Sequence, residues 1–130
     1  MSDLILCGNK RVSNKGLKTL LDTIGEYNIR ITQLHFSNCD FDDESCKVIF
    51  EYFRKYFRKS VLSKIYLAKN KEITSEGISI LSDIFNHNFV SDFHFNFRIY
   101  VDGCCGGKKS RHSKWDWRIY FFDGEIIDNH

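Results

Sequence analysis

The stretch that decides the fold is Asn9–Leu17 (NKRVSNKGL), because it returns 61 residues later as Asn70–Ile78 (NKEITSEGI). Midway between the two, residues 34–41 (LHFSNCDF) follow the order apolar, any residue, apolar, two intervening residues, Asn or Cys, and then another apolar residue. A fixed period, here 30 and 31 residues, is typical of repeat architectures, in which each unit buries its apolar face against the next. The sequence therefore predicts three stacked copies of one unit.

Each unit combines a short strand of alternating apolar residues with an amphipathic helix whose apolar residues recur every three or four positions. The matching positions are Leu4, Leu6, Asn9 and Val12, then Leu34, Phe36, Cys39 and Phe41, then Ile65, Leu67, Asn70 and Ile73. Ser13, Asp42 and Thr74 directly precede the three helices, where a side-chain oxygen can accept hydrogen bonds from the first helical amides. We therefore expect these three residues to be N-caps.

The three units resemble the leucine-rich repeat, and their length and helical half are most similar to its ribonuclease-inhibitor-like subclass. The resemblance covers residues 3–95, with Phe36 and Phe41 in place of the usual leucines. It implies that Asn9, Cys39 and Asn70 turn inward and hydrogen-bond the backbone of the strand-to-helix loops. Cys39 is then expected to be a buried, unreactive thiol, because no cation is placed to stabilise its thiolate.

The C-terminal quarter follows a different pattern. Residues 93–101 and residues 115–122 each alternate between the two faces of a strand, and Asp123-Gly124 is a strong turn signal. We therefore expect a small antiparallel hairpin or sheet that caps the open end of the stack. Phe93 follows Ile65 by 28 residues, which predicts that a fourth repeat strand begins there.

These patterns predict an α/β fold, a short leucine-rich-repeat solenoid of parallel strands plus helices with a C-terminal antiparallel β hairpin or small sheet as its cap. Residues 1–97 are expected to form three repeats and a fourth strand. Residues 98–130 are expected to form a β extension with a basic, Gly- and Cys-rich loop, packed on the same domain. A chain of 130 residues without proline is consistent with one compact domain.

Strand residues that point away from the core predict a binding surface on the concave side of the sheet. The period of two along each strand places these residues in three rows, which mix aromatic, imidazole and charged groups as protein interfaces do. The candidate partner-binding residues are Gln33, His35, Ser37, Lys64, Tyr66, Asp92, His94 and Asn96. We therefore expect a non-catalytic protein–protein interaction module, a scaffold whose protein partner the sequence does not identify.

A basic segment supports a competing interpretation, in which the chain binds nucleic acid through residues 108–117. Cations there could track a phosphate backbone while tryptophans stack on bases. The residues concerned are Lys108, Lys109, Arg111, Lys114, Trp115 and Trp117. The alternative is a solvated loop with core tryptophans. A phosphate-binding loop does not fit, because Lys109 separates Lys108 from Ser110.

Overall charge and the start of the chain give no sign of a nucleic-acid partner or of a membrane. Nineteen basic and seventeen acidic side chains give a formal net charge of +2, too small to imply a nucleic-acid or membrane partner through overall charge. The chain begins without the basic region and apolar run of a signal sequence, so a cytoplasmic protein without a membrane partner is expected. Five cysteines without a paired spacing fit reduced thiols.

No set of nucleophile, base and orienting group is brought together by the repeat pattern, so we expect no enzymatic activity and no cofactor. Cys104, Cys105 and His112 lack the separated ligand pairs of a zinc module, so no metal site is expected. The two cysteines are instead expected to lie exposed in their glycine-rich loop, where they would be sensitive to oxidation. Finally, the strand that begins at Leu4 has an open edge, which predicts either self-association through that end or descent from a longer repeat array that lost its beginning.

Overall fold

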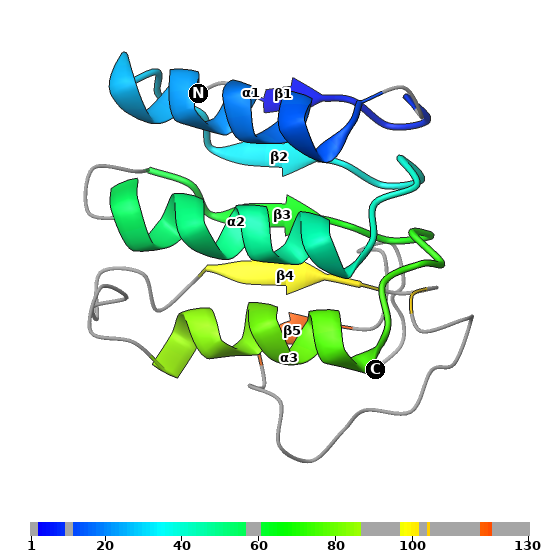
Figure 1. Ribbon diagram of the computed structural model, residues 1–130. Coiled ribbons are helices and arrows are strands. Elements are labelled where there is room, and N and C mark those ends of the chain that lie inside the picture. Colours follow the sequence, from blue (N-terminus) through cyan, green and yellow to red (C-terminus); the bar gives the residue numbers. More distant parts are fainter. Residues whose placement is uncertain are drawn as a thin grey trace.

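A parallel sheet with helices packed against one of its faces forms the framework of the protein (Figure 1). The computed structural model describes residues 3–9, 12–56, 61–86, 97–101, 104 and 118–120. In chain order the elements are β1 (Asp3–Ile5), α1 (Asn14–Glu26), β2 (Gln33–His35), α2 (Asp43–Tyr56), β3 (Lys64–Tyr66), α3 (Ser75–Asp83), the 3₁₀ helix η2 (Ile84–Asn86), β4 (Arg98–Tyr100) and β5 (Ile119–Tyr120).

The strands lie in the order β1-β2-β3-β4-β5 and every neighbouring pair is parallel. Leu4 is paired with Leu34, and Leu34 with Ile65, so the three predicted strands begin side by side and in register. The register continues from Ile65 to Ile99 and from Ile99 to Ile119. An α/β fold is therefore confirmed, with five parallel strands and three α-helices in the described part of the chain.

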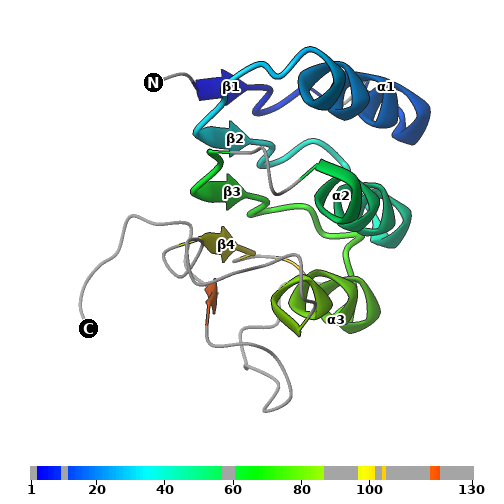
Figure 2. The same ribbon diagram turned by 90° about the vertical axis from the view of Figure 1, so that its left-hand side faces the viewer.

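The hydrophobic core lies between the sheet and the helices, which form two separate layers (Figure 2). Alternation along each strand sends one residue inward, and Leu34, Ile65, Ile99 and Ile119 are all buried. From the helices, the predicted apolar stripe supplies buried side chains such as Leu21, Ile49 and Leu81. The residues between the inward-facing ones are left on the opposite face of the sheet, which we call the helix-free face.

All three predicted N-caps are confirmed. Ser13 accepts a hydrogen bond from the Gly16 amide at 3.0 Å, and Thr74 accepts one from the Glu76 amide at 3.2 Å. Asp42 accepts one from the Ser45 amide at 3.1 Å, while Ser45 Oγ accepts one from the Asp42 amide at 3.0 Å. Each cap satisfies amides that have no partner within the helix.

Two of the predicted inward-facing loop residues take their expected roles. Asn70 is fully buried; its Oδ1 accepts from the amides of Cys39 and Phe41, and its Nδ2 donates to the carbonyls of Phe36 and Leu67. Cys39 is also buried, and its Sγ donates to the Leu6 carbonyl at 2.9 Å. Both side chains therefore join neighbouring units.

The first unit departs from this pattern, because Asn9 is exposed and not turned inward as predicted. Asn70 is buried because it reaches the backbone of the preceding unit at Phe36, Cys39 and Phe41. Asn9 belongs to the unit of β1, which is the edge of the sheet among the described strands. The difference in burial therefore follows from position in the stack.

The predicted antiparallel cap is wrong in its strand direction, because β4 and β5 are parallel. Residues 101–118 separate the two strands in the sequence. Parallel neighbours need a crossover connection of about a dozen residues or more, and this separation is long enough for one. Alternation along a strand predicts which residues share a face, but it carries no information about strand direction. The turn signal at residues 123–124 lies outside the described residues.

The predicted register of the fourth strand is also wrong. The neighbours of Lys64 and Tyr66 on β4 are Arg98 and Tyr100, so the strand pairs 34 residues after β3 and not 28. Asp92, His94 and Asn96, expected in those rows, lie outside the described residues. A long alternating run is compatible with several registers. The observed register aligns Ile99 with Ile65 and Leu34, so that Cys104, five residues after Ile99, matches Cys39, five residues after Leu34.

Cys104 is fully buried and is not in an exposed loop as predicted. Its Sγ donates to the Leu67 carbonyl at 3.3 Å, and its amide donates to the Val101 carbonyl at 3.0 Å. Cys105 lies outside the described residues.

None of the helices in the described ranges combines the length and the apolar character needed to cross a membrane.

Candidate binding surface

A column of side chains crosses the helix-free face at right angles to the strands. The register brings Ile5, His35, Tyr66, Tyr100 and Tyr120 side by side, one from each strand. The His35 and Tyr66 rings stack with centroids 4.7 Å apart and planes inclined by 14°. Tyr66 and Tyr100 stack at 4.9 Å and 11°. We call His35, Tyr66, Tyr100 and Tyr120 the aromatic column.

The ring spacing in the column follows from the backbone. Neighbouring parallel strands lie about 4.8 Å apart, so equivalent side chains on successive strands meet at a distance that suits ring stacking. Tyr120 ends the column with its ring turned by 65° to that of Tyr100, at 5.1 Å between centroids. Within the described part of the chain, the strand spacing by itself therefore brings the four rings together.

Burial between neighbouring rings changes the chemistry of the column. Desolvation raises the pKa of the Tyr66 phenol, and the negative charge of Asp3 adds to the rise. Desolvation also raises the pKa of Tyr100, although Lys64 and Arg98 act in the opposite direction. The two hydroxyls therefore stay protonated at neutral pH and remain available as hydrogen-bond donors.

Two cations flank the column on the neighbouring row of the same face. Lys64 and Arg98 are paired across β3 and β4, and both side chains are half-buried. Arg98 Nε donates to the Tyr120 hydroxyl at 3.0 Å, and its guanidinium lies 5.8 Å from the centre of the Tyr120 ring. The guanidinium is thus held beside the column by Tyr120.

The opposite end of the face is acidic. Asp3 Oδ2 lies 3.4 Å from His35 Nε2, within ion-pair distance when the imidazole is protonated. The pair is not aligned as a hydrogen bond, and Nε2 is buried without a hydrogen-bond partner among the described residues. Charge along the face therefore runs from negative at β1 to positive at β3 and β4.

Four of the predicted site residues share this face: Gln33, His35, Lys64 and Tyr66 are all half-buried on β2 and β3. Ser37 lies beyond β2, in the loop where its carbonyl accepts from the Gly8 amide at 3.1 Å. Lys108, Lys109, Arg111 and Lys114 lie outside the described residues.

The sequence reasoning missed Arg98, Tyr100 and Tyr120. A signal for the first two was present, because Ile99, Val101 and Cys104 repeat the spacing of Leu34, Phe36 and Cys39.

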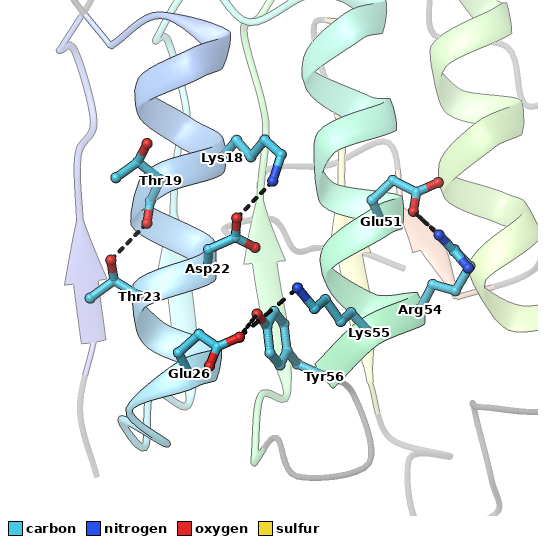
Figure 3. A network of polar contacts seen from close by, with 9 residues as sticks. All are labelled: Lys18, Thr19, Asp22, Thr23, Glu26, Glu51, Arg54, Lys55 and Tyr56. Carbon is cyan, nitrogen blue, oxygen red and sulfur yellow. Dashed lines mark hydrogen bonds and ion pairs between the residues drawn. The ribbon is translucent and has the colours of Figure 1, made fainter.

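A groove of about 710 Å³ lies on the other side of the molecule, between α1 and α2. Its acidic lining residues are already matched to basic ones: Asp22 with Lys18 at 2.7 Å, Glu51 with Arg54 at 2.5 Å, and Glu44 with Lys47 at 3.7 Å. Figure 3 shows the first two of these pairs, along with Glu26 of α1 reaching Tyr56 and Lys55 of α2. The contacts of Glu26 join α1 to α2, whereas the three acid–base pairs each lie within one helix, so we assign these contacts a structural role.

Glu51 accepts a hydrogen bond from Arg54 Nε, and Lys55 Nζ lies 3.9 Å from Glu26 Oε2. Among the described residues, no three His, Cys, Asp or Glu side chains are grouped so that they could hold a metal ion.

Comparison with models of known protein families finds no match for the chain, and a search among curated proteins finds none either.

Proposed function

We propose that the chain is a short leucine-rich-repeat solenoid that binds a protein partner through its helix-free face, the concave surface of such a fold. The repeat assignment is supported by three in-register strand–helix units and by the hydrogen bonds of Asn70 and Cys39 to neighbouring units. Cys104 supports the repeat assignment further. Its thiol donates to the Leu67 carbonyl, just as the Cys39 thiol donates to the Leu6 carbonyl two units earlier.

The observation that carries the binding proposal is the aromatic column. Tyrosine is among the residues most enriched at energetically important positions of interfaces, since it supplies a large contact area with few rotatable bonds. In the column, the stacking partners already fix the rings of Tyr66 and Tyr100. Because these side chains are already ordered, binding a partner would cost little side-chain entropy.

Affinity capture from native lysate tests this proposal with three proteins of matched expression: wild type, His35→Ala/Tyr66→Ala and Lys108→Ala/Lys109→Ala. We expect the first double variant to lose a captured protein that the second retains. Far-UV circular dichroism of each variant serves as the folding control. Loss in only the second variant would move the site to residues 108–117, and retention by both would reject the helix-free face.

A further inference from the structure

We propose that the helix-free face recognises an acidic, extended peptide segment, whose carboxylates lie over β3 and β4 beside Tyr66, Tyr100, Lys64 and Arg98. This inference rests on the proposed function and specifies the chemistry of the partner. It follows from the orientation of the rings, from the donors they present and from the distribution of charge.

Stacking determines which part of each ring a partner can reach. The faces of Tyr66 are directed at His35 on one side and Tyr100 on the other, at 4.7 and 4.9 Å between centroids. The negative face of an aromatic ring attracts cations, whereas its edge is positive. Because the faces are turned toward one another, the column offers its edges and hydroxyls, which favour an anion over a cation.

The hydroxyls add directional donors to these edges. No hydrogen bond joins the Tyr66 or Tyr100 hydroxyl to another residue within the described ranges, and the raised pKa of each phenol keeps its proton in place. Tyr120 accepts a hydrogen bond from Arg98 Nε, so its own O–H proton can point toward a ligand. A carboxylate only accepts hydrogen bonds, so it is complementary to this set of donors.

Charge selects the orientation of the segment. Lys64 and Arg98 form the cationic end of the face, and both are close enough to Tyr100 to influence the pKa of its phenol. Asp3 at β1 would repel a carboxylate there. The carboxylates are therefore placed at the tyrosine end, with neutral or basic residues toward β1.

The same features argue for a peptide over a nucleic acid. Nucleic-acid binding draws its affinity from many phosphate contacts, and single strands add base stacking on exposed aromatic faces. Here the faces of the central rings are engaged with one another, and Asp3 shares the face with the two cations. Five strands spaced by about 4.8 Å span about 19 Å, the length of about six residues of extended chain.

The test is a titration of isotopically labelled full-length protein, followed by amide resonances in NMR spectra at low salt. The probes are a Glu/Ser peptide of about six residues, a Lys/Ser peptide of equal length, and single-stranded oligothymidylate. We expect only the Glu/Ser peptide to give saturable shifts centred on residues 64–66 and 98–100. Preference for the Lys/Ser peptide, or an equal or stronger response to oligothymidylate at these residues, would overturn the proposal, as would shifts located elsewhere.

Variants complete the test. Lys64→Gln is expected to weaken binding of the Glu/Ser peptide by about fivefold. Lys15→Gln makes the same change of charge on α1 and is expected to leave binding unaltered. Tyr66→Phe/Tyr100→Phe keeps the stacked rings but removes both donors, and is expected to weaken binding by about tenfold. If Lys64→Gln and Lys15→Gln weakened binding of the Glu/Ser peptide equally, the effect would come from the net charge of the protein and not from the helix-free face, and the proposal would be overturned.

The outcome is separable from that of the proposed function. If a partner captured from lysate is lost in His35→Ala/Tyr66→Ala but the Glu/Ser peptide does not bind, the helix-free face binds proteins by another chemistry, and only the inference fails. If the captured partner is unaffected by that double variant, the proposed function itself fails.

Discussion

Cys104 occupies in the fourth strand-to-loop segment the place that Cys39 occupies in the second. Cys104 lies five residues after the inward-facing Ile99, and its thiol donates to the Leu67 carbonyl. Cys39 lies five residues after the inward-facing Leu34, and its thiol donates to the Leu6 carbonyl. Asn70 holds the equivalent position between them. Asn and Cys therefore alternate along the stack as residues that join backbone to backbone.

Thiol reactivity should divide the cysteines by burial. Cys7 is exposed, whereas Cys39, Cys46 and Cys104 are buried, and desolvation raises the pKa of the Cys39 thiol. Because the thiolate is the reactive form, an alkylating reagent is expected to modify Cys7 before Cys39, Cys46 and Cys104 in the folded protein. Mass-spectrometric mapping against reaction time checks this order, and denaturation in urea should abolish it. Modification of Cys104 as fast as Cys7 would contradict its buried position.

Replacing Asn70 should be among the most destabilising single changes. Asn70→Ala leaves two amides and two carbonyls without their side-chain partner in a fully buried site, so we expect a loss of about 3 kcal/mol in the free energy of unfolding. Asn9→Ala changes the same residue type at the matching but exposed position, and should cost less than about 1 kcal/mol. Urea denaturation measures both, and equal losses would refute the role assigned to Asn70.

Two helical glycines should respond in opposite directions to alanine. A Cβ on Gly25 would clash with the ring of Tyr56, so Gly25→Ala must push α1 and α2 apart and is expected to cost about 1–3 kcal/mol. At Gly16 the nearest atom would be Ser13 Oγ at 3.5 Å, and alanine's higher helix propensity should stabilise by up to about 1 kcal/mol. Thermal melts followed by circular dichroism test the pair. A destabilising Gly16→Ala would show that the start of α1 is packed more tightly than described.

Acid should remove the stabilising contribution of Asp42. Burial by itself would raise the pKa of this carboxyl, but hydrogen bonds from Asn14, Ser45 and the Glu44 amide outweigh it, so the pKa lies below its ordinary value of 3.8. Between the folded and unfolded pKa values, the unfolded chain binds more protons, so stability rises with pH through this window. The contribution is therefore present above 3.8 and is lost as pH falls through the folded value.

The check is the difference in unfolding free energy between wild type and Asp42→Asn, measured at constant ionic strength over a series of acidic pH values. We expect that difference to narrow as pH falls. Asp83→Asn, an exposed change on α3, controls for the loss of one negative charge. A difference that stays constant down to the lowest pH would mean that the Asp42 charge contributes nothing.

The edge of β1 should support self-association. Ile5, Tyr27 and Ile29 are 63%, 78% and 46% exposed, and all three belong to the first unit. Open strand edges pair readily with other chains, and a charge on the edge opposes this pairing. Sedimentation velocity is expected to show dimers that grow with concentration in wild type and fewer in Ile5→Lys. A monomer at every concentration would reject the expectation.

Periodicity predicted the parts of the fold that local chemistry controls. The strands at Leu4, Leu34 and Ile65 and the caps at Ser13, Asp42 and Thr74 follow from alternation and from side-chain oxygens before amphipathic runs. Strand direction and register after residue 86 depend on long-range pairing. Alternation through Phe93, Phe95, Phe97 and Ile99 is compatible with more than one register, so the neighbours of Lys64 on β4 were predicted wrongly. Alternation also does not indicate strand direction, so the direction of β5 was predicted wrongly.

The same distinction applies to the candidate surface. The positions of His35 and Tyr66 on neighbouring strands followed from the repeat, and so did their adjacency. The extension of the column to Tyr100 required the correct fourth-strand register, which the spacing from Ile99 to Cys104 could have supplied. The further extension to Tyr120 depends on the pairing of β5 with β4, which that spacing does not predict.

The start of α2 shares its polar groups with the units on both sides. Asn14 and Ser45 converge on the Asp42 carboxylate, while Asp43 accepts hydrogen bonds from both the amide and the hydroxyl of Thr74. A middle unit that melted alone would expose these carboxylates and deprive both neighbouring helices of partners at their first turn. The three units are therefore expected to unfold together, in a single cooperative transition, and half-folded forms should be scarce at equilibrium.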